Sequence, residues 1–160
     1  MSETVAAVVL WLFIVNLGIA FGAGLYEHRI VLSRWLQGAP GGWHWNGEAV
    51  RLDDTGRRFW GFVTTLPLTL LTLLSMWAAI DATGTLRTWW LVASAAALAD
   101  RLLTFFYFIP TMIGLMKATD SPAAVMVATR WRTLNYLRLA TVFIAWLAAM
   151  KAFALFYRAA

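Results

Sequence analysis

Four long apolar runs constrain the fold of this chain more than any other feature of its sequence. Each has about 20 residues or more, which is enough for a helix to cross a hydrocarbon core of about 30 Å. Of the 160 residues, 61% are hydrophobic and only 13% are charged, a balance unlike that of a soluble domain. The sequence therefore predicts an all-α integral membrane protein, an antiparallel bundle of four transmembrane helices forming one domain over residues 1–160. The predicted spans are Val5–Val31, Phe59–Ile80, Trp89–Met116 and Thr133–Tyr157.

The segments between these runs predict how the helices are connected. The first connection, Ser33–Arg58, is long and polar, and Asn46-Gly47 within it is a type I′ turn signal that predicts a small interfacial hairpin. The second, Asp81–Thr88, is short and requires antiparallel neighbours. In the third, Pro122 follows polar residues and predicts the start of a helix.

The basic residues predict the orientation in the membrane. Those around the first and third connections are Arg29, Arg34, Arg51, Arg57, Arg58, Lys117, Arg130 and Arg132. The opposite side has only Arg87, Lys151 and Arg158. By the positive-inside rule, connections one and three are cytoplasmic and both termini lie outside. The net charge of +5 is explained by this topology, so the expected partner is the lipid bilayer and not nucleic acid.

Several glycine, histidine and tryptophan residues are expected to have structural roles and no role in catalysis. The spacing of Gly18 and Gly22 predicts close helix packing. His28 is expected at the interface, about 100° around the helix from Glu27, and His44 is expected to have no specific role in its polar loop. Five tryptophans are expected in the interfacial aromatic belt: Trp35, Trp43, Trp45, Trp89 and Trp90.

The stretch from Gly18 to Trp35 is the main candidate site, because it places Glu27 and Arg29 in succession before the apolar run ends. Charged groups at this depth are costly unless they face protein or water, which makes a functional site the default interpretation. At about 1.5 Å per residue, Tyr107 and Arg138 lie in the same layer as Glu27. Asp100 and Arg101 are expected nearer the midplane.

Helical phase predicts that these polar residues share an interior. On each helix they follow one stripe, so facing stripes would enclose a polar pocket open to the cytoplasmic side. The residues expected to bind a ligand there are Trp60, Thr64, Thr104, Asp100, Arg101 and Trp131.

A metal or haem site is not expected. The chain has two histidines and no cysteine, and His44 lies in a loop, so a set of three transition-metal ligands is difficult to assemble. The sequence predicts no metal and no other cofactor.

Four short motifs carry a family resemblance. They are Gly22-Ala23-Gly24-Leu25-Tyr26-Glu27-x-Arg29, Arg57-Arg58-Phe59-Trp60, Tyr107-Phe108-Ile109-Pro110-Thr111 and Trp131-x-x-x-Asn135-x-x-Arg138. In these motifs and in its layout the chain resembles the small four-helix membrane proteins related to anthrone oxygenases. That family comprises mostly bacterial proteins, together with fungal enzymes that oxidise anthrones to anthraquinones. The resemblance implies the four-helix fold, a bacterial inner membrane, a small flat hydrophobic ligand and oxygenation without a cofactor.

The first functional hypothesis is an enzyme. A carboxylate near lipid can act as a general base, so Glu27 would remove an acidic ring proton. Arg138, Asn135 and Tyr107 would stabilise the enolate that forms, by charge and hydrogen bonds. Trp60, Phe105 and Phe108 would provide aromatic walls for the ring system.

The second hypothesis is a membrane carrier or an accessory subunit without enzymatic activity. Glu27 could form a structural ion pair with Arg29 or Arg138, and Asp100 could pair with Arg101 or Arg138. The outer half of the bundle offers few polar side chains for a transport path through a monomer. The sequence leaves the formation of a homo-oligomer open.

Overall fold

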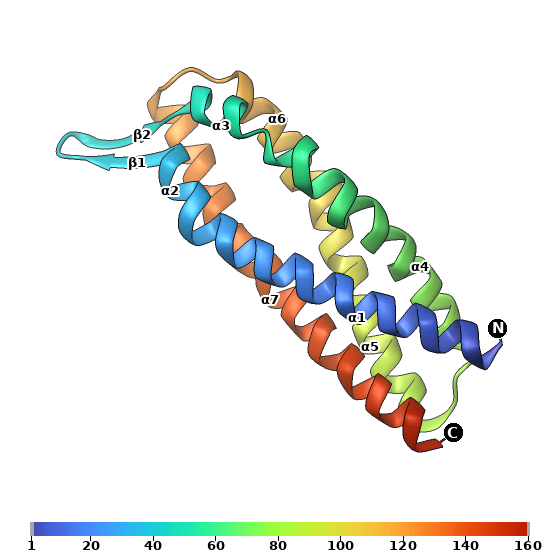
Figure 1. Ribbon diagram of the computed structural model, residues 1–160. Coiled ribbons are helices and arrows are strands. Elements are labelled where there is room, and N and C mark those ends of the chain that lie inside the picture. Colours follow the sequence, from blue (N-terminus) through green and yellow to red (C-terminus); the bar gives the residue numbers. More distant parts are fainter. Residues whose placement is uncertain (1, 160) are drawn as a thin grey trace.

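The computed structural model describes residues 2–159 and is almost entirely helical (Figure 1). Four helices are long and apolar enough to cross a membrane, at Glu3–Trp35, Gly56–Asp81, Gly84–Lys117 and Pro122–Arg158. The protein is therefore a multi-pass integral membrane protein, and the predicted bundle with a polar first loop is confirmed. Each helix is longer than its predicted span, because polar turns extend the apolar runs at their ends.

The elements follow one another in a simple order. The first helix comprises α1 (Glu3–Tyr26), η1 (Glu27–Val31) and α2 (Leu32–Trp35). The first connection contains β1 (Leu36–Ala39), β2 (Gly42–Trp45) and α3 (Gly47–Asp53). The second helix comprises η2 (Gly56–Thr65) and α4 (Leu66–Asp81). The third comprises α5 (Gly84–Leu103), η3 (Thr104–Phe108) and α6 (Ile109–Lys117), and the fourth is α7 (Pro122–Ala159).

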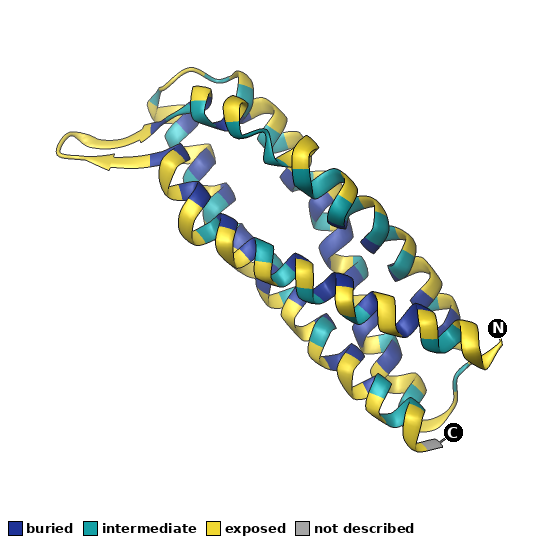
Figure 2. Cartoon of the chain, viewed as in Figure 1, coloured by how far each residue is buried: buried dark blue, intermediate teal, exposed yellow. Residues whose placement is uncertain are grey.

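The bundle has two apolar cores. In the half away from the hairpin, α1, α4, α5 and α7 pack around small residues and large ones such as Phe13, Leu17 and Trp90. Near the hairpin a second core includes Trp45 and Trp131. Buried residues face the interior, while exposed residues cover the outer faces (Figure 2), where many large apolar side chains are available to lipid.

Three of the four helices contain a π-helical segment, and all three segments (η1, η2 and η3) lie in the half of the bundle near the hairpin. π-helical turns are rare and occur frequently at functional sites. They also alter the backbone hydrogen bonds, which neighbouring side chains can compensate. Asn16 provides such compensation here, because its Nδ2 donates a hydrogen bond to the Val63 carbonyl oxygen in η2 at 2.9 Å.

The predicted hairpin is confirmed, but its turn is not where the sequence signal placed it. β1 and β2 are antiparallel, with Leu36 opposite Trp45 and Ala39 opposite Gly42. The turn is Pro40-Gly41 and not Asn46-Gly47. The Asn46 side chain instead accepts a hydrogen bond from the Ala49 amide at 3.0 Å and caps α3. Asparagine suits both positions, and the helix cap prevails here.

The other two connections agree with their predictions. Only two residues, Ala82 and Thr83, separate α4 from α5, so these helices are antiparallel neighbours. Pro122 begins α7 as predicted, and the Ser121 hydroxyl oxygen accepts a hydrogen bond from the Ala124 amide at 3.2 Å.

The tryptophan prediction agrees with the exposure of only two of the five residues. Trp43 and Trp89 are exposed. Trp35, Trp45 and Trp90 are buried in the interior, so their assignment to the interfacial belt is wrong. Burial is tolerated at Trp35 and Trp45 because each indole N–H donates a hydrogen bond, at 2.8 and 3.0 Å, to an acceptor in another element.

The glycine prediction holds at one position and fails at the other. A Cβ at Gly18 would lie 3.3 Å from the Trp146 side chain, so this glycine does permit close approach of α7. A Cβ at Gly22 would meet nothing within 4 Å. The tightest contact occurs instead at Gly24, where a Cβ would lie 2.7 Å from Leu139 Cδ2.

Candidate functional site

A cavity of about 420 Å³ lies in the half of the bundle near the hairpin, and all four helices contribute to its walls. We call it the bundle cavity. Of the four residues predicted to be catalytic, Glu27 and Arg138 line it. All six residues predicted to bind a ligand line it: Trp60, Thr64, Thr104, Asp100, Arg101 and Trp131.

Glu27 is the first residue of η1 and is only 5% exposed. Its Oε1 accepts two hydrogen bonds, from Trp60 Nε1 at 2.7 Å and from Thr55 Oγ1 at 3.1 Å. Its Oε2 lies 3.7 Å from Arg138 Nη2, which is an ion pair longer than a hydrogen bond. One carboxylate oxygen is therefore fixed by two donors, while the other has a cation nearby and no hydrogen bond from the described residues.

The Arg138 guanidinium is held between two aromatic rings. Its Cζ lies 5.1 Å from the Trp60 ring centroid and 5.0 Å from the Phe108 ring centroid. Stacking of this kind stabilises a cation away from water. Trp60 thus contacts both members of the pair, since its N–H binds Glu27 and its ring contacts Arg138. We call Glu27, Thr55, Trp60 and Arg138 the Glu27 cluster.

A second polar group lies deeper along the third helix, and we call Asp100, Arg101 and Thr104 the Asp100 cluster. All three residues are buried. Arg101 bonds the Oδ2 of its neighbour Asp100 through both Nε, at 3.0 Å, and Nη2. Within the described chain, Asp100 Oδ1, Arg101 Nη1 and Thr104 Oγ1 have no hydrogen-bond partner.

The spacing of residues along the third helix explains which side chains reach the cavity. Its contributions recur at every fourth position, Asp100, Thr104, Phe108, Met112 and Met116, and the adjacent Arg101, Ile109 and Ile113 line the cavity beside them. The π-helical turn η3 lies within this series, and its wider turn shifts the phase relative to a regular α-helix. Residues spaced as in a regular α-helix, at about 3.6 per turn, therefore face away from the cavity after Thr104.

Three residues of the predicted site lie elsewhere. Tyr107 is outside the cavity lining and contacts Phe108 edge-on, with ring centroids 5.3 Å apart. Asn135 is fully buried but does not line the cavity, and neither of its amide atoms has a partner among the described residues. Phe105 is 43% exposed and points away from the interior, so its predicted place in the aromatic wall is wrong.

Sequence reasoning did not identify two contributors at the start of the second helix. Thr55 and Asp54 both line the cavity, and Thr55 donates to Glu27. In the sequence both residues suggest helix capping. Thr55 occupies the N-cap position of η2, but its side chain makes no capping hydrogen bond. No local signal distinguishes the two roles, because the bond to Glu27 joins residues 28 apart.

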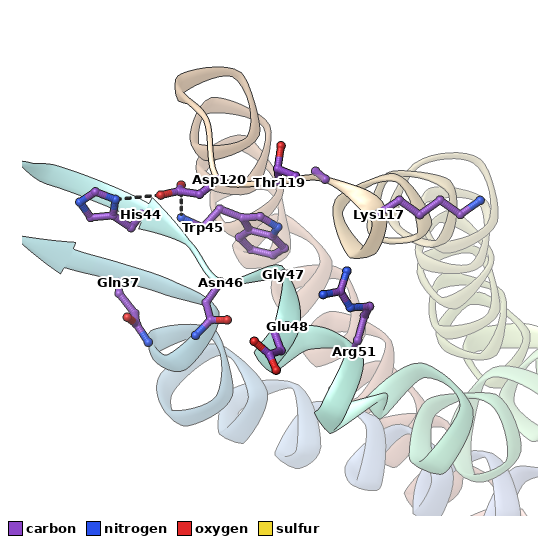
Figure 3. A pocket seen from close by; sticks show the side chains of 11 residues that line it. Gln37, His44, Trp45, Asn46, Gly47, Glu48, Arg51, Lys117, Thr119 and Asp120 are labelled. Carbon is purple, nitrogen blue, oxygen red and sulfur yellow. Dashed lines mark hydrogen bonds and ion pairs between the residues drawn. The ribbon is translucent and has the colours of Figure 1, made fainter.

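A second pocket, of about 430 Å³, lies between the hairpin and the segment joining α6 to α7 (Figure 3). Asp120 connects the two: Oδ2 lies 2.9 Å from His44 Nδ1, and Oδ1 accepts from the Trp45 amide at 2.8 Å. These bonds hold the pKa of the Asp120 carboxyl below its usual range, the Trp45 amide contributing most. His44 was expected to have no specific role, but it bonds Asp120 and so helps to join the hairpin to the segment between α6 and α7.

Among residues 2–159, no group of three or more histidine, cysteine, aspartate or glutamate side chains could hold a metal ion. Comparison with family models, curated proteins and solved structures finds no match for this chain. The geometry of the bundle cavity is therefore the main basis for a functional argument.

Proposed function

We propose that the protein binds a small, flat hydrophobic molecule in the bundle cavity and oxidises it with dioxygen, with Glu27 as the general base. The observation that carries the proposal is the position of Glu27. Its carboxylate borders a largely apolar cavity with one oxygen oriented by Trp60 and Thr55 and the other free of hydrogen bonds from the described residues. Catalytic bases are commonly oriented by fixed donors in this way.

The shape of the cavity supports entry of the ligand from the membrane. Ile109 and Ile113 of α6 line the cavity and are 37% and 49% exposed, respectively. Gly56 of η2 also lines the cavity and is exposed. An opening between η2 and α6 would admit an apolar molecule dissolved in lipid. The surplus of basic residues near the hairpin supports a cytoplasmic location for this end of the bundle.

The proposed reaction is the conversion of an activated ring CH₂ group into a carbonyl. Glu27 Oε2 accepts one proton from the CH₂ group, and the resulting enolate is stabilised by the nearby Arg138 cation. Dioxygen forms a C–O bond with the enolate carbon to give a peroxide anion, which takes the proton back from Glu27. The hydroperoxide then loses water, so that one CH₂ group and one dioxygen yield one carbonyl and one water molecule.

The resemblance to anthrone oxygenases supports anthrone as the first substrate to test. The purified protein in lipid nanodiscs is incubated with anthrone in air, and anthraquinone is measured against empty nanodiscs. Glu27→Gln should lower turnover by a factor of about 100 or more, because general base catalysis contributes about 10²–10⁴. Glu48→Gln is the matched control, because Glu48 is exposed outside the bundle cavity.

Turnover by the Glu27→Gln variant at the level of the original protein would reject Glu27 as the base. No turnover by the original protein would reject the oxygenase proposal. Thermal unfolding of both variants shows whether either substitution disturbs the fold.

One observation favours a second function, binding without chemistry. Each buried carboxylate of the cavity already has a guanidinium partner, Glu27 with Arg138 and Asp100 with Arg101. Such pairs are also typical of carriers and accessory subunits. Saturable binding of anthrone to the original protein without formation of anthraquinone would support this second function.

A further inference from the structure

We infer that the Asp100 cluster recognises an uncharged group that both donates and accepts hydrogen bonds, such as a hydroxyl, at the leading end of the ligand. The inference rests on the proposed function, because the ligand must occupy the bundle cavity to reach this cluster. It adds a chemical class of ligand and names the residues that select it.

The first argument is the set of atoms that lack partners. Among the described residues, Asp100 Oδ1 is an unpaired acceptor, Arg101 Nη1 is an unpaired donor, and the Thr104 hydroxyl can act as either. All three belong to buried side chains that line the bundle cavity. Ten buried side-chain atoms of the described residues lack a partner, and these three are the ones whose residues line the bundle cavity. Buried polar groups in proteins are nearly always paired, so their grouping at one wall of a cavity points to a site for a polar group.

The second argument is charge. The Asp100 carboxylate and the Arg101 guanidinium already bond each other, so the pair is neutral as a whole. A charged ligand group would enter this buried site without a counter-ion of its own, which is costly. A hydroxyl avoids that cost, because it can donate to Asp100 Oδ1 and accept from Arg101 Nη1 or Thr104 Oγ1.

The third argument is a comparison between threonines. Thr64 also lines the cavity, but its hydroxyl donates to the Trp60 carbonyl at 3.1 Å. Thr72, buried on the same helix as Thr64, donates to the Leu68 carbonyl at 2.6 Å. The helix carbonyls therefore satisfy these two hydroxyls, whereas the Thr104 hydroxyl has no partner among the described residues.

The position of the cluster determines the orientation of the ligand. Thr104 lies about 13 Å along the third helix from Ile113, which borders the proposed opening. A ligand entering there places its leading end at the Asp100 cluster and its apolar body among the apolar side chains of the lining, such as Met112 and Leu139. Its flank then faces the Glu27 cluster.

The experiment compares two probes that differ by one hydroxyl, tritiated 2-naphthol and tritiated naphthalene. Binding to the protein in nanodiscs is measured by scintillation proximity, and binding to empty nanodiscs is subtracted to remove partitioning into lipid. We expect 2-naphthol to bind about tenfold more tightly, the equivalent of one good hydrogen bond. Thr104→Val should reduce this preference about threefold, while naphthalene affinity stays the same.

Thr72→Val is the matched control, because it removes a buried hydroxyl that the cavity does not contact, and it should leave the preference unchanged. Equal binding of the two probes would overturn this inference alone. A preference that Glu27→Gln abolishes and Thr104→Val leaves intact would overturn it as well, by placing the hydroxyl at the Glu27 cluster. Failure of both probes to bind would instead reject the proposed ligand-binding function.

Discussion

The Glu27–Arg138 pair predicts a strongly asymmetric double-mutant cycle. Arg138→Met leaves a carboxylate that is 5% exposed without its cation, and breaking a buried pair in this way costs about 3–5 kcal/mol. We expect about 3 kcal/mol, the lower end of that range. The reasons are the 3.7 Å separation of the charges and the two hydrogen bonds that Glu27 Oε1 retains from Trp60 and Thr55.

Glu27→Gln should cost less, about 1 to 2 kcal/mol of stability. The amide oxygen can still accept from Trp60 and Thr55, and the Arg138 cation remains stacked on the Trp60 and Phe108 rings. The double variant contains no uncompensated charge, so we expect it to lose only about 2 kcal/mol of stability. This loss is clearly smaller than the sum of the losses in the two single variants.

The measurement is equilibrium unfolding in mixed micelles at pH 7, with SDS as the denaturant. The control cycle uses Arg34 and Asp53, an ion pair 3.0 Å apart outside the bundle cavity, whose side chains are 58% and 23% exposed. Exposed pairs couple by about 0.2–1 kcal/mol. The reasoning is refuted if the buried pair couples no more strongly than this control, or if Glu27→Gln destabilises more than Arg138→Met.

Two further predictions concern packing and pH. Gly24→Ala should destabilise the protein by about 1 kcal/mol because its Cβ would displace Leu139, whereas Gly22→Ala should be nearly neutral; equal thermal unfolding of the two variants would contradict this. Because the pKa of Asp120 is lowered in the folded protein, its stabilising effect is present above its ordinary pKa of about 3.9 and is lost as the pH falls further, through the lowered value. Protection of the Trp45 amide in hydrogen exchange, corrected for intrinsic rates, should therefore fall with acid, and Asp120→Asn should remove this dependence. Identical profiles for the two proteins would exclude Asp120 as the titrating group.

The sequence by itself determined that the protein is a four-helix membrane bundle with charged groups in the interior of one half. The physical reason is that lipid offers no hydrogen bonds, so long apolar runs must be helical and each charge must turn toward protein or water. This requirement acts on every residue of a run. It therefore placed Glu27, Asp100, Arg101 and Arg138 correctly at a shared cavity without any knowledge of their contacts.

The sequence also predicted Trp60, Thr64, Thr104 and Trp131 beside these charges, but the tertiary structure alone decided the remaining neighbours. The π-helical segments change the rotation of the three helices that contain them, and no residue pattern in the sequence predicted these segments. In the third helix this change leaves Tyr107 outside the cavity, while Phe108, predicted for the aromatic wall, lines it. Likewise Thr55 reaches Glu27 only because the first connection folds back onto the first helix. A helix turns about 100° per residue, so a shift of a single position is enough to exchange a predicted cavity residue for its neighbour.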